Sequence, residues 1–228
     1  MRTAPEGAAG QRHWPSPRLR VPTLMLVTDR RLAGGVDALL DAVNEAVEGG
    51  VTAVQLREKD LPAEELLPLA RRLRDVTRNR AALVVNGPLE VALAVGADGI
   101  HLPEGAPMAE RRSRPFLIGR SVHSLAAAKA AWADCNSYLI AGPIFETASH
   151  PNAAPAGLEL IESIAAAVAM PVLAIGGITG ERVRDVVRAG AGGVAVISDI
   201  FSAQSPRKAA QRLKNALTEE SSLVERIY

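Results

Sequence analysis

Two cationic residues, Arg57 and Lys59, lie two positions apart at the end of an apolar run of the chain. Because side chains of a strand alternate between its two faces, both belong to the same face as Gln55. Neighbouring positive charges in a partly desolvated cleft favour an anionic ligand. In the alternative interpretation they are solvated or paired with Glu58 and Asp60, and the run alone favours neither.

A second candidate anion site is near the other end of the chain, where glycines follow an apolar run. Gly176-Gly177 follows one such run, and Ile197-Ser198 ends the next, ahead of a short helical turn. Glycine lets backbone N–H groups approach a phosphate closely, and a helix start carries partial positive charge. We expect Gly176, Gly177, Ile197 and Ser198 to bind a phosphate mainly through backbone N–H groups. A tight turn without a ligand is the alternative for the glycine pair.

Two of the four histidines, His101 and His123, lie at the ends of apolar runs. The alternation along Leu117–Val122 places His123 on the same face as Gly119 and Ser121, which we expect to face a ligand. Histidine titrates close to neutral pH, so it can accept and return a proton in one catalytic cycle. A structural histidine is an equally good explanation of the spacing for both residues.

Eight short runs rich in Val, Ile and Leu alternate with Ala- and Leu-rich amphipathic runs, as expected for βα units around a parallel sheet. The predicted strands are Thr23–Thr28, Val51–Arg57, Ala81–Asn86, Gly99–Leu102, Pro115–Val122, Ser137–Ala141, Val172–Ile175 and Gly193–Ser198. The predicted helices are Gly35–Glu48, Ala63–Thr77, Leu89–Val95, Ala106–Arg112, Leu125–Ala133, Leu158–Val168, Gly180–Ala189 and Pro206–Leu217.

Eight such units predict a single (β/α)8 barrel, a TIM barrel, at the small end of that fold's size range. In this fold the functional residues lie at the carboxyl ends of the strands, which agrees with the positions of the candidate residues. An open doubly wound sheet is the alternative, but Thr28-Asp29-Arg30-Arg31 is not the glycine-rich turn that usually follows its first strand. We expect residues 1–21 to form a flexible tail and residues 22–228 the barrel.

Composition excludes several classes of protein. The single cysteine, Cys135, excludes an internal disulfide framework and suits a reducing cytoplasm, where we expect the protein. A net charge of +1 and an aromatic content of 3% argue against nucleic acid as a partner. No run approaches 18 uninterrupted apolar residues, so we expect no membrane partner either.

Five motifs, in order along the chain, resemble those of the thiamine-phosphate synthase and TenI superfamily. They are Val27-Thr28-Asp29-Arg30, Gln55-Leu56-Arg57-Glu58-Lys59, Gly142-Pro143-Ile144-Phe145, Ala174-Ile175-Gly176-Gly177-Ile178 and Gly193-Val194-Ala195-Val196-Ile197-Ser198. The resemblance covers about Thr23 to Leu217 and implies a (β/α)8 fold. It also implies enzymes whose synthase branch joins hydroxymethylpyrimidine diphosphate to a thiazole phosphate with the help of Mg²⁺.

Three departures from the synthase pattern stand out. The synthases have Asn-Asp-Arg after strand three, where this chain has Asn86-Gly87-Pro88, and a second metal-binding Asp is matched by Ala106. A Thr-x-Thr-Lys segment that contacts diphosphate appears as Thr147-Ala148-Ser149-His150, without the lysine. Mg²⁺ prefers carboxylate and phosphate oxygens, so losing both carboxylates should weaken a metal–diphosphate site, and Glu104 replaces at most one of them.

The departures favour the TenI branch, which resembles thiazole tautomerase. Ile118-Gly119-Arg120-Ser121-Val122-His123-Ser124 is similar to a motif of that branch. The resemblance implies that His123 is the catalytic acid/base. By the same resemblance, we expect the protein to isomerise a carboxythiazole phosphate tautomer to its aromatic form, with no metal and no other cofactor. The expected substrate-binding residues are Gln55, Arg57, Lys59, Asn86, Thr147, Gly176, Gly177, Ile197 and Ser198.

Two other functions are kept as alternatives. One is a Mg²⁺-dependent thiamine-phosphate synthase, and the other is a non-catalytic regulatory protein that binds thiamine precursors. The expected partner in each case is a small phosphorylated molecule. Outer helices of a barrel also allow a homo-oligomer, which an apolar stripe alone does not establish.

Overall fold

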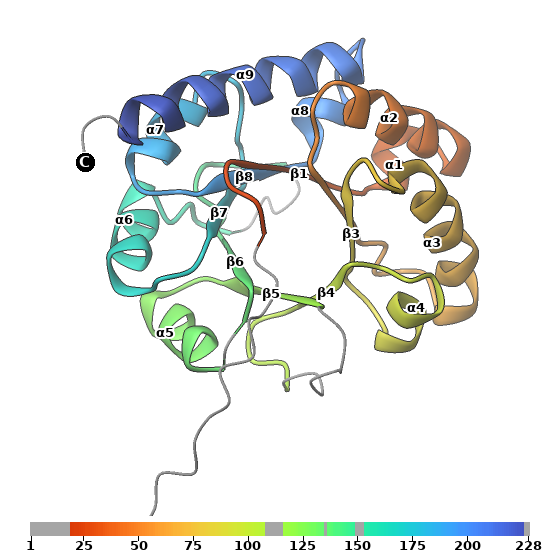
Figure 1. Cartoon of the computed structure of the whole chain (residues 1–228), viewed down its shortest axis with the longest axis horizontal. Helices are drawn as coiled ribbons and strands as arrows, with labels where there is room; N and C mark the ends of the chain where they lie inside the picture. The colour runs from red at the N-terminus through yellow and green to blue at the C-terminus, as the bar shows by residue number, and fades with distance from the viewer. Residues whose placement is uncertain (1–18, 108–115, 135, 149–152, 226–228) are drawn as a thin grey trace, which may run out of the picture.

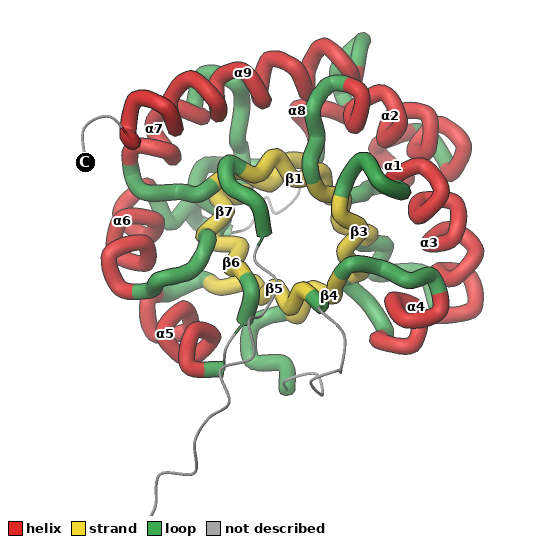
Figure 2. The backbone as a smooth tube through the Cα atoms, viewed as in Figure 1, coloured by secondary structure: helices red, strands yellow, loops and turns green. Residues whose placement is uncertain are grey.

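The computed structural model describes residues 19–107, 116–134, 136–148 and 153–225. Eight parallel strands close into a barrel in the order in which they occur in the chain. Helices surround this ring of strands on the outside (Figures 1 and 2). The prediction of a single (β/α)8 barrel is confirmed.

The strands are short and close to their predicted positions. Both faces of a barrel strand are buried, so each reads as a continuous apolar run. Their bounds are β1 Thr23–Val27, β2 Ala53–Leu56, β3 Ala82–Val85, β4 Gly99–Leu102, β5 Leu117–Val122, β6 Tyr138–Ala141, β7 Val172–Ile175 and β8 Gly193–Val196.

The helices alternate with the strands and pack their apolar stripes against them. Two of them, α1 and α8, are single turns at the carboxyl end of the barrel. The bounds are α1 Arg30–Ala33, α2 Val36–Glu48, α3 Ala63–Thr77, α4 Leu89–Ala94, α5 Leu125–Ala133, α6 Leu158–Ala167, α7 Val183–Arg188, α8 Ser198–Phe201 and α9 Pro206–Glu225.

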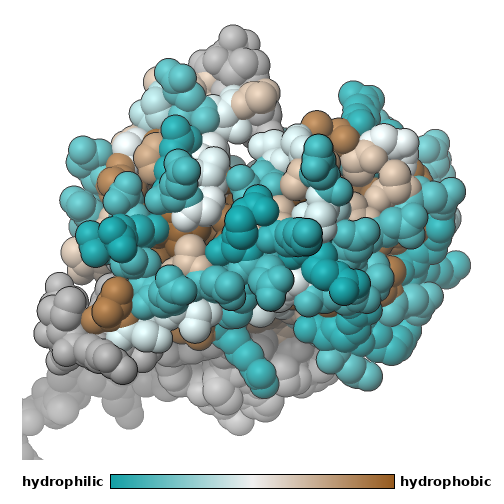
Figure 3. Space-filling model, turned by 90° about the horizontal axis from the view of Figure 1, so that it is seen from above, coloured by the Kyte–Doolittle hydropathy of each residue, from teal (hydrophilic) through white to brown (hydrophobic). Residues whose placement is uncertain are grey.

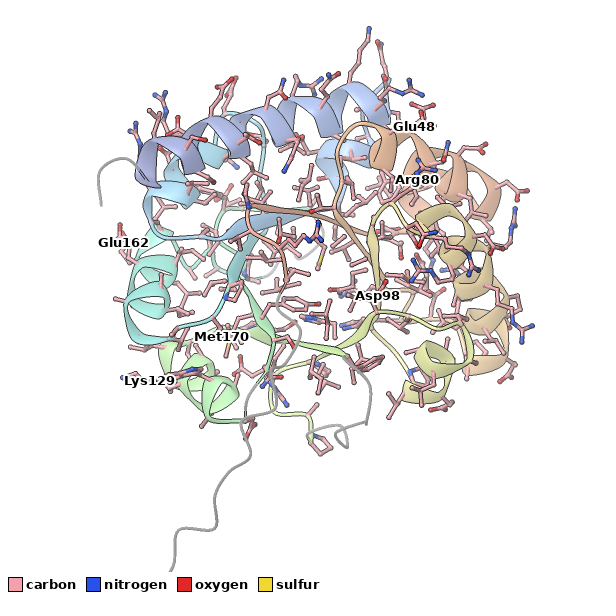
Figure 4. All side chains as sticks on the ribbon, in the orientation of Figure 1. Glu48, Arg80, Asp98, Lys129, Glu162 and Met170 are labelled. Atoms are coloured by element: carbon pink, nitrogen blue, oxygen red, sulfur yellow. The ribbon has the colours of Figure 1, made fainter. Side chains whose placement is uncertain are left out.

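The register of the strands separates the core into two layers. Met25 of β1 lies beside Ala53 of β2 and Ala195 of β8, and all three point into the barrel. Alternate residues such as Leu24 and Val54 point outward and pack under the helices. Small and large side chains thus fill the interior together, as Figure 4 shows, and the barrel is a packed core rather than a pore.

Polar contacts at the amino ends of the strands hold helices to the barrel. Arg74 of α3 donates from Nη1 to Oδ2 of Asp98 at 2.7 Å, just ahead of β4. The same oxygen accepts a hydrogen bond from the backbone N–H of Leu83 at 2.8 Å. This end of the molecule is built from structural contacts, whereas the candidate residues gather at the opposite end.

Three helix predictions need correction. The last helix continues beyond Leu217, because the carboxylate of Glu220 is buried against Arg184 and Arg188 of α7. The short helix α1 was not predicted, although its Asp29 cap accepts backbone hydrogen bonds at its start. The helix expected to begin at Ala106 is absent at residues 106–107, where the Ala106 carbonyl accepts a hydrogen bond from Arg120.

Several predictions lie outside the described residues. They concern most of the tail at 1–18, the remainder of the helix expected at 106–112, the first residue of the fifth predicted strand, Cys135 and His150. At the start of the described chain, Leu19 is buried and packs against the inward-facing cluster of the barrel.

The outer surface on the α9 side is mainly hydrophilic. Figure 3 views this side and shows hydrophobic residues scattered among hydrophilic ones. Within the described ranges, no helix has the length and apolar character needed to cross a membrane.

Candidate active site

The carboxyl ends of the strands surround a cavity of about 480 Å³. Each residue predicted to act on or bind the substrate lines this cavity. They are Gln55, Arg57, Lys59, Asn86, His123, Thr147, Gly176, Gly177, Ile197 and Ser198. The alternation of side chains along β2 and β5, and the loops after β7 and β8, bring together residues that are far apart in the chain. Their individual roles stay predictions.

The acidic neighbours of the two cations are occupied by other partners. Glu58 is buried and accepts hydrogen bonds from the backbone N–H of Arg30 at 3.1 Å and from its Nη1 at 3.0 Å. Asp60 pairs with Arg30 at 2.6 Å and with Arg31 at 2.8 Å. Contacts between the loop after β2 and helix α1 thus satisfy the carboxylates that alternate with the cations.

Arg57 and Lys59 consequently face the cavity without a compensating charge. Within the described ranges, neither cation forms an ion pair with a carboxylate. The charge of Arg57, followed by partial burial, lowers the pKa of Lys59. Repulsion between the two cations is relieved when an anion binds between them, so this wall of the cavity suits a phosphate or diphosphate group.

Gln55 and Asn86 add polar groups on the same side. Gln55 is 3% exposed, and its Oε1 atom is buried without a hydrogen-bond partner. A buried acceptor of this kind costs free energy unless a ligand or water donates to it. Asn86 is held by a hydrogen bond of 3.3 Å from its Nδ2 to the carbonyl of His101. Gln55 therefore has a free acceptor for an N–H or O–H group of a bound molecule.

The opposite wall consists largely of backbone. Gly176 and Gly177 have φ values of +97° and +63°, a region that favours glycine. A Cβ atom at Gly177 would lie 2.4 Å from the carbonyl oxygen of Glu146. Among the described residues, the backbone N–H groups of Gly176 and Gly177 have no acceptor. They are available to a phosphate oxygen, and the phosphate-binding role of the loop stays a prediction.

Contacts outside the cavity fix this glycine loop in place. Arg182 donates from Nη1 to the carbonyl of Gly177 at 2.7 Å, and its guanidinium lies 4.6 Å from the ring centroid of Phe145. The backbone N–H of Phe145 donates to the carbonyl of Gly176 at 3.1 Å. The carbonyl groups of the loop are thus bound on the outer side, which leaves the N–H groups for the cavity.

The loop after β8 continues the backbone wall. Ile197 and Ser198 line the cavity where α8 begins, directly beside the glycine loop. Thr147, from the loop after β6, also lines the cavity. The neighbouring Ser149 and His150 are outside the described residues.

His123 lies at the rim of the cavity, with 60% of its side chain exposed. Its backbone N–H donates to Oε2 of Glu104 at 2.7 Å, and its Nδ1 lies 3.2 Å from the same oxygen. Glu104 was not predicted to contact His123, because it lies on the loop after β4 and no local pattern joins the two.

His101 of β4 is buried inside the barrel, at 2% exposed, and it also lines the cavity. Its Nε2 lies 2.8 Å from Oγ of Ser121, and its Nδ1 lies 3.3 Å from the hydroxyl of Tyr138. Burial, followed by the charges of Arg120 and Arg57, lowers the pKa of His101 to about 3, so the imidazole is neutral near pH 7. Ser121 lies on the face of β5 that the alternation of side chains predicts to meet a ligand, although it is not among the predicted substrate-binding residues.

The described residues do not fit a magnesium site built on two carboxylates. Glu104 is the one carboxylate that lines the cavity within the described ranges, and it is bonded to His123. A Cβ atom at Gly87 would lie 2.9 Å from Cδ2 of the buried Leu66, so a side chain there would start toward the apolar core. No group of three or more His, Cys, Asp or Glu arranged to hold a metal occurs in the described ranges.

The comparisons with known proteins point in one direction. Residues 24–200 match the family model described as "Thiamine monophosphate synthase". The chain belongs to the thiamine monophosphate synthase family. The thiamine-phosphate synthase of Moorella thermoacetica is 42% identical over 201 residues, which cover 86% of this chain and 95% of the relative. The thiamine-phosphate synthase of Pyrococcus furiosus is 40% identical over 200 residues, 86% of this chain and 95% of the relative.

A solved structure agrees with this family. The thiamine phosphate pyrophosphorylase from Pyrococcus furiosus is 36% identical and superposes with a TM-score of 0.76. The match covers 87% of this chain and 96% of that structure. The match therefore extends over most of the chain.

The predicted tautomerase function is wrong. It rested on His123 and on the missing carboxylates, which are few positions in a chain that is about 40% identical to thiamine-phosphate synthases along nearly its full barrel. The structure also places His123 at an exposed rim against Glu104 rather than in an enclosed site. The family comparison favours the synthase alternative, and the isomerase class has no support from it.

Proposed function

We propose that this protein is a thiamine-phosphate synthase, which joins a hydroxymethylpyrimidine diphosphate to a thiazole phosphate and releases diphosphate. The observation that carries the proposal is one cavity with cationic side chains on one wall and backbone N–H groups on the other. Arg57 and Lys59 supply cationic side chains, and Gly176 and Gly177 supply free backbone N–H groups. Two phosphorylated substrates need two such sites, placed so that their ring systems meet between them.

The reaction breaks one bond and forms another. The bond between the methylene carbon of the pyrimidine and the diphosphate oxygen breaks, and its electron pair leaves with the diphosphate. The lone pair of the thiazole ring nitrogen forms the new C–N bond, and the product is a thiazolium. No proton has to be transferred in this step, so the acid/base role predicted for His123 is not required.

The residues of the two walls have different roles in this reaction. Negative charge increases on the diphosphate as it leaves, and the unpaired cations Arg57 and Lys59 are positioned to stabilise that charge. The glycine loop holds the phosphate of the thiazole, which orients the ring nitrogen toward the methylene carbon. The free Oε1 of Gln55 accepts a hydrogen bond from the bound pyrimidine and fixes its ring.

Magnesium is the cofactor that the family resemblance implies, but the described residues do not supply the two carboxylates it needs. We therefore propose that the cations of the cavity wall carry the neutralisation of diphosphate in this chain. The prediction that no organic cofactor is required remains part of the proposal.

The test is a direct assay of the purified protein with both substrates. We expect thiamine phosphate and inorganic diphosphate to appear in equal amounts, with Mg²⁺ and also in the presence of EDTA. The Arg57→Gln/Lys59→Gln variant should lose the activity, whereas an Arg71→Gln/Lys129→Gln variant, changed on outer helices, should retain it. Tight binding of both substrates with no thiamine phosphate formed would contradict the synthase proposal and favour the precursor-binding protein instead.

A further inference from the structure

Three polar side chains form a hydrogen-bonded series from the interior of the barrel to the cavity. Tyr138 is fully buried on β6, His101 is 2% exposed on β4, and Ser121 lines the cavity from β5. The hydroxyl of Tyr138 contacts Nδ1 of His101, and Nε2 of His101 contacts Oγ of Ser121. Both His101 and Ser121 line the cavity, and within the described ranges the Ser121 hydroxyl is the end of this hydrogen-bonded series that has no further partner.

Gly119 makes the room for this arrangement. A Cβ atom at position 119 would lie 2.1 Å from Cζ of Tyr138, 2.4 Å from its hydroxyl and 2.6 Å from Nδ1 of His101. Any side chain here would therefore displace the two rings from each other. The contact between Tyr138 and His101 depends on the absence of a Cβ atom at Gly119.

The buried end fixes the direction of the hydrogen bonds. Among the described residues, the Tyr138 hydroxyl has one possible acceptor, Nδ1 of His101. If Nδ1 carried the proton instead, the buried hydroxyl hydrogen of Tyr138 would have no acceptor, which is unfavourable. Tyr138 therefore donates, Nδ1 accepts, and the proton of the neutral ring is on Nε2.

The next hydrogen bond, toward the cavity, keeps the same order of donor and acceptor. Nε2–H donates to Oγ of Ser121 at 2.8 Å, so Oγ is used as an acceptor. The structure gives the Ser121 hydroxyl no other partner within the described ranges, and its own hydrogen is left to donate into the cavity. Ser121 lines the same cavity as the cations Arg57 and Lys59.

We propose that Tyr138 and His101 are positioning residues that hold the Ser121 hydroxyl as a hydrogen-bond donor to an anionic phosphate oxygen of the substrate. The inference deepens the proposed function, on which it rests for the identity of the ligand. The direction of the hydrogen bonds follows from the buried contacts alone and does not depend on that function.

The first test reads the protonated nitrogen of His101 directly. In long-range ¹H–¹⁵N correlation spectra of the ¹⁵N-labelled protein, the His101 ring should show a protonated Nε2 and a bare Nδ1 throughout the neutral pH range. Its signals are assigned by their loss in His101→Asn, or by elimination using His13→Asn, His123→Asn and His150→Asn if that variant does not fold. A protonated Nδ1, or a ring protonated on both nitrogens, overturns the proposal.

The second test measures how the three residues act together on binding. With inorganic diphosphate as the probe in calorimetry, Ser121→Ala should weaken affinity about tenfold, as expected for one lost hydrogen bond to a charged group. Tyr138→Phe should weaken it about threefold, because the His101 ring is then free to adopt both tautomers. In the Ser121→Ala background, Tyr138→Phe should have no further effect.

The controls separate positioning from folding. Ser163→Ala, which removes a hydroxyl on α6 away from the cavity, should leave diphosphate affinity unchanged. Thermal unfolding of each variant shows whether a loss of affinity reflects a loss of structure. An equal effect of Tyr138→Phe with and without Ser121 would indicate a merely structural role and overturn the proposal.

The two proposals fail in different ways. A wild-type protein that binds no diphosphate contradicts the proposed function, while the protonated nitrogen of His101 still decides the present inference. A ring with a protonated Nδ1 in an active synthase overturns the inference and leaves the function intact.

Discussion

The two walls of the cavity, which we propose bind the phosphorylated groups, offer an anion different partners. The wall after β2 uses the charged side chains of Arg57 and Lys59, whose acidic neighbours are occupied by Arg30 and Arg31. The wall after β7 and β8 uses backbone N–H groups, exposed by glycines at positive φ. The wall after β2 depends on the identity of its side chains, whereas the wall after β7 and β8 depends on the conformation of its backbone.

This difference has consequences for binding. Side-chain charges respond to pH and to salt, and their effect on affinity extends over several ångströms. Backbone N–H groups do not titrate in the physiological range, and they require a phosphate oxygen to sit at hydrogen-bond distance. One wall therefore contributes mainly charge neutralisation, and the other contributes mainly position.

The largest expected effect comes from removing the charges of the first wall. In Arg57→Gln/Lys59→Gln, we expect the affinity for inorganic diphosphate to fall at least about 100-fold, because two charge-assisted hydrogen bonds are lost. Affinity for thiazole phosphate should fall less than about threefold. Calorimetry at low and high salt measures both.

The matched control for this pair is Arg71→Gln/Lys129→Gln, which removes the same charges from exposed positions on α3 and α5. Figure 4 shows Lys129 on the outside of the barrel. Equal losses of affinity for both ligands in the cavity variant would show that the two walls are not separate sites.

A smaller effect is expected for a change in the glycine loop, and it should weaken the binding of thiazole phosphate rather than that of diphosphate. Gly177→Ala introduces a Cβ atom at positive φ, 2.4 Å from the Glu146 carbonyl, so the loop must shift. We expect thiazole phosphate to bind about tenfold more weakly and the free energy of unfolding to fall by about 1–3 kcal/mol. Diphosphate affinity should be nearly unchanged.

Gly180→Ala is the control for the loop variant, because a Cβ atom at position 180 meets no atom within 4 Å. Calorimetry and urea unfolding of both variants provide the comparison. A loss of diphosphate affinity in Gly177→Ala that matches the loss for thiazole phosphate would contradict a purely local role of the backbone wall.

The smallest expected effect concerns pH. The charge of Arg57 lowers the pKa of Lys59, so Lys59 loses its proton at a lower pH than an isolated lysine does. Diphosphate affinity should therefore begin to decline below the ordinary lysine pKa. In Arg57→Gln the decline should move to higher pH, although the affinity itself is lower. An alkaline decline that stays in place in this variant would show that Lys59 is not the group responsible.

Much of the fold could be predicted because both faces of each strand are buried. The apolar runs locate β4 and β7 to the residue and the other strands to within about two residues. Helix α1 was missed because a four-residue turn has no periodicity to detect. The extension of α9 was missed because it depends on Glu220 meeting two arginines of α7.

The cavity residues could also be predicted, since side-chain alternation and the barrel rule together select the carboxyl ends of the strands. The partners of those residues could not. The pairing of Glu58 with Arg30, of Glu104 with His123 and of Tyr138 with His101 joins separate βα units, and no local pattern specifies it. The predicted tautomerase function is wrong for a related reason, because a few missing carboxylates say less about the reaction than similarity along most of the chain.

Gly119 limits which amino-acid substitutions this barrel can accept during evolution. A larger residue there is incompatible with Tyr138 and His101 as they stand, so an exchange has to alter at least two strands together. Among related sequences, we expect positions 119, 138 and 101 to vary as a unit. A library randomised at all three should yield folded variants that no series of single substitutions reaches.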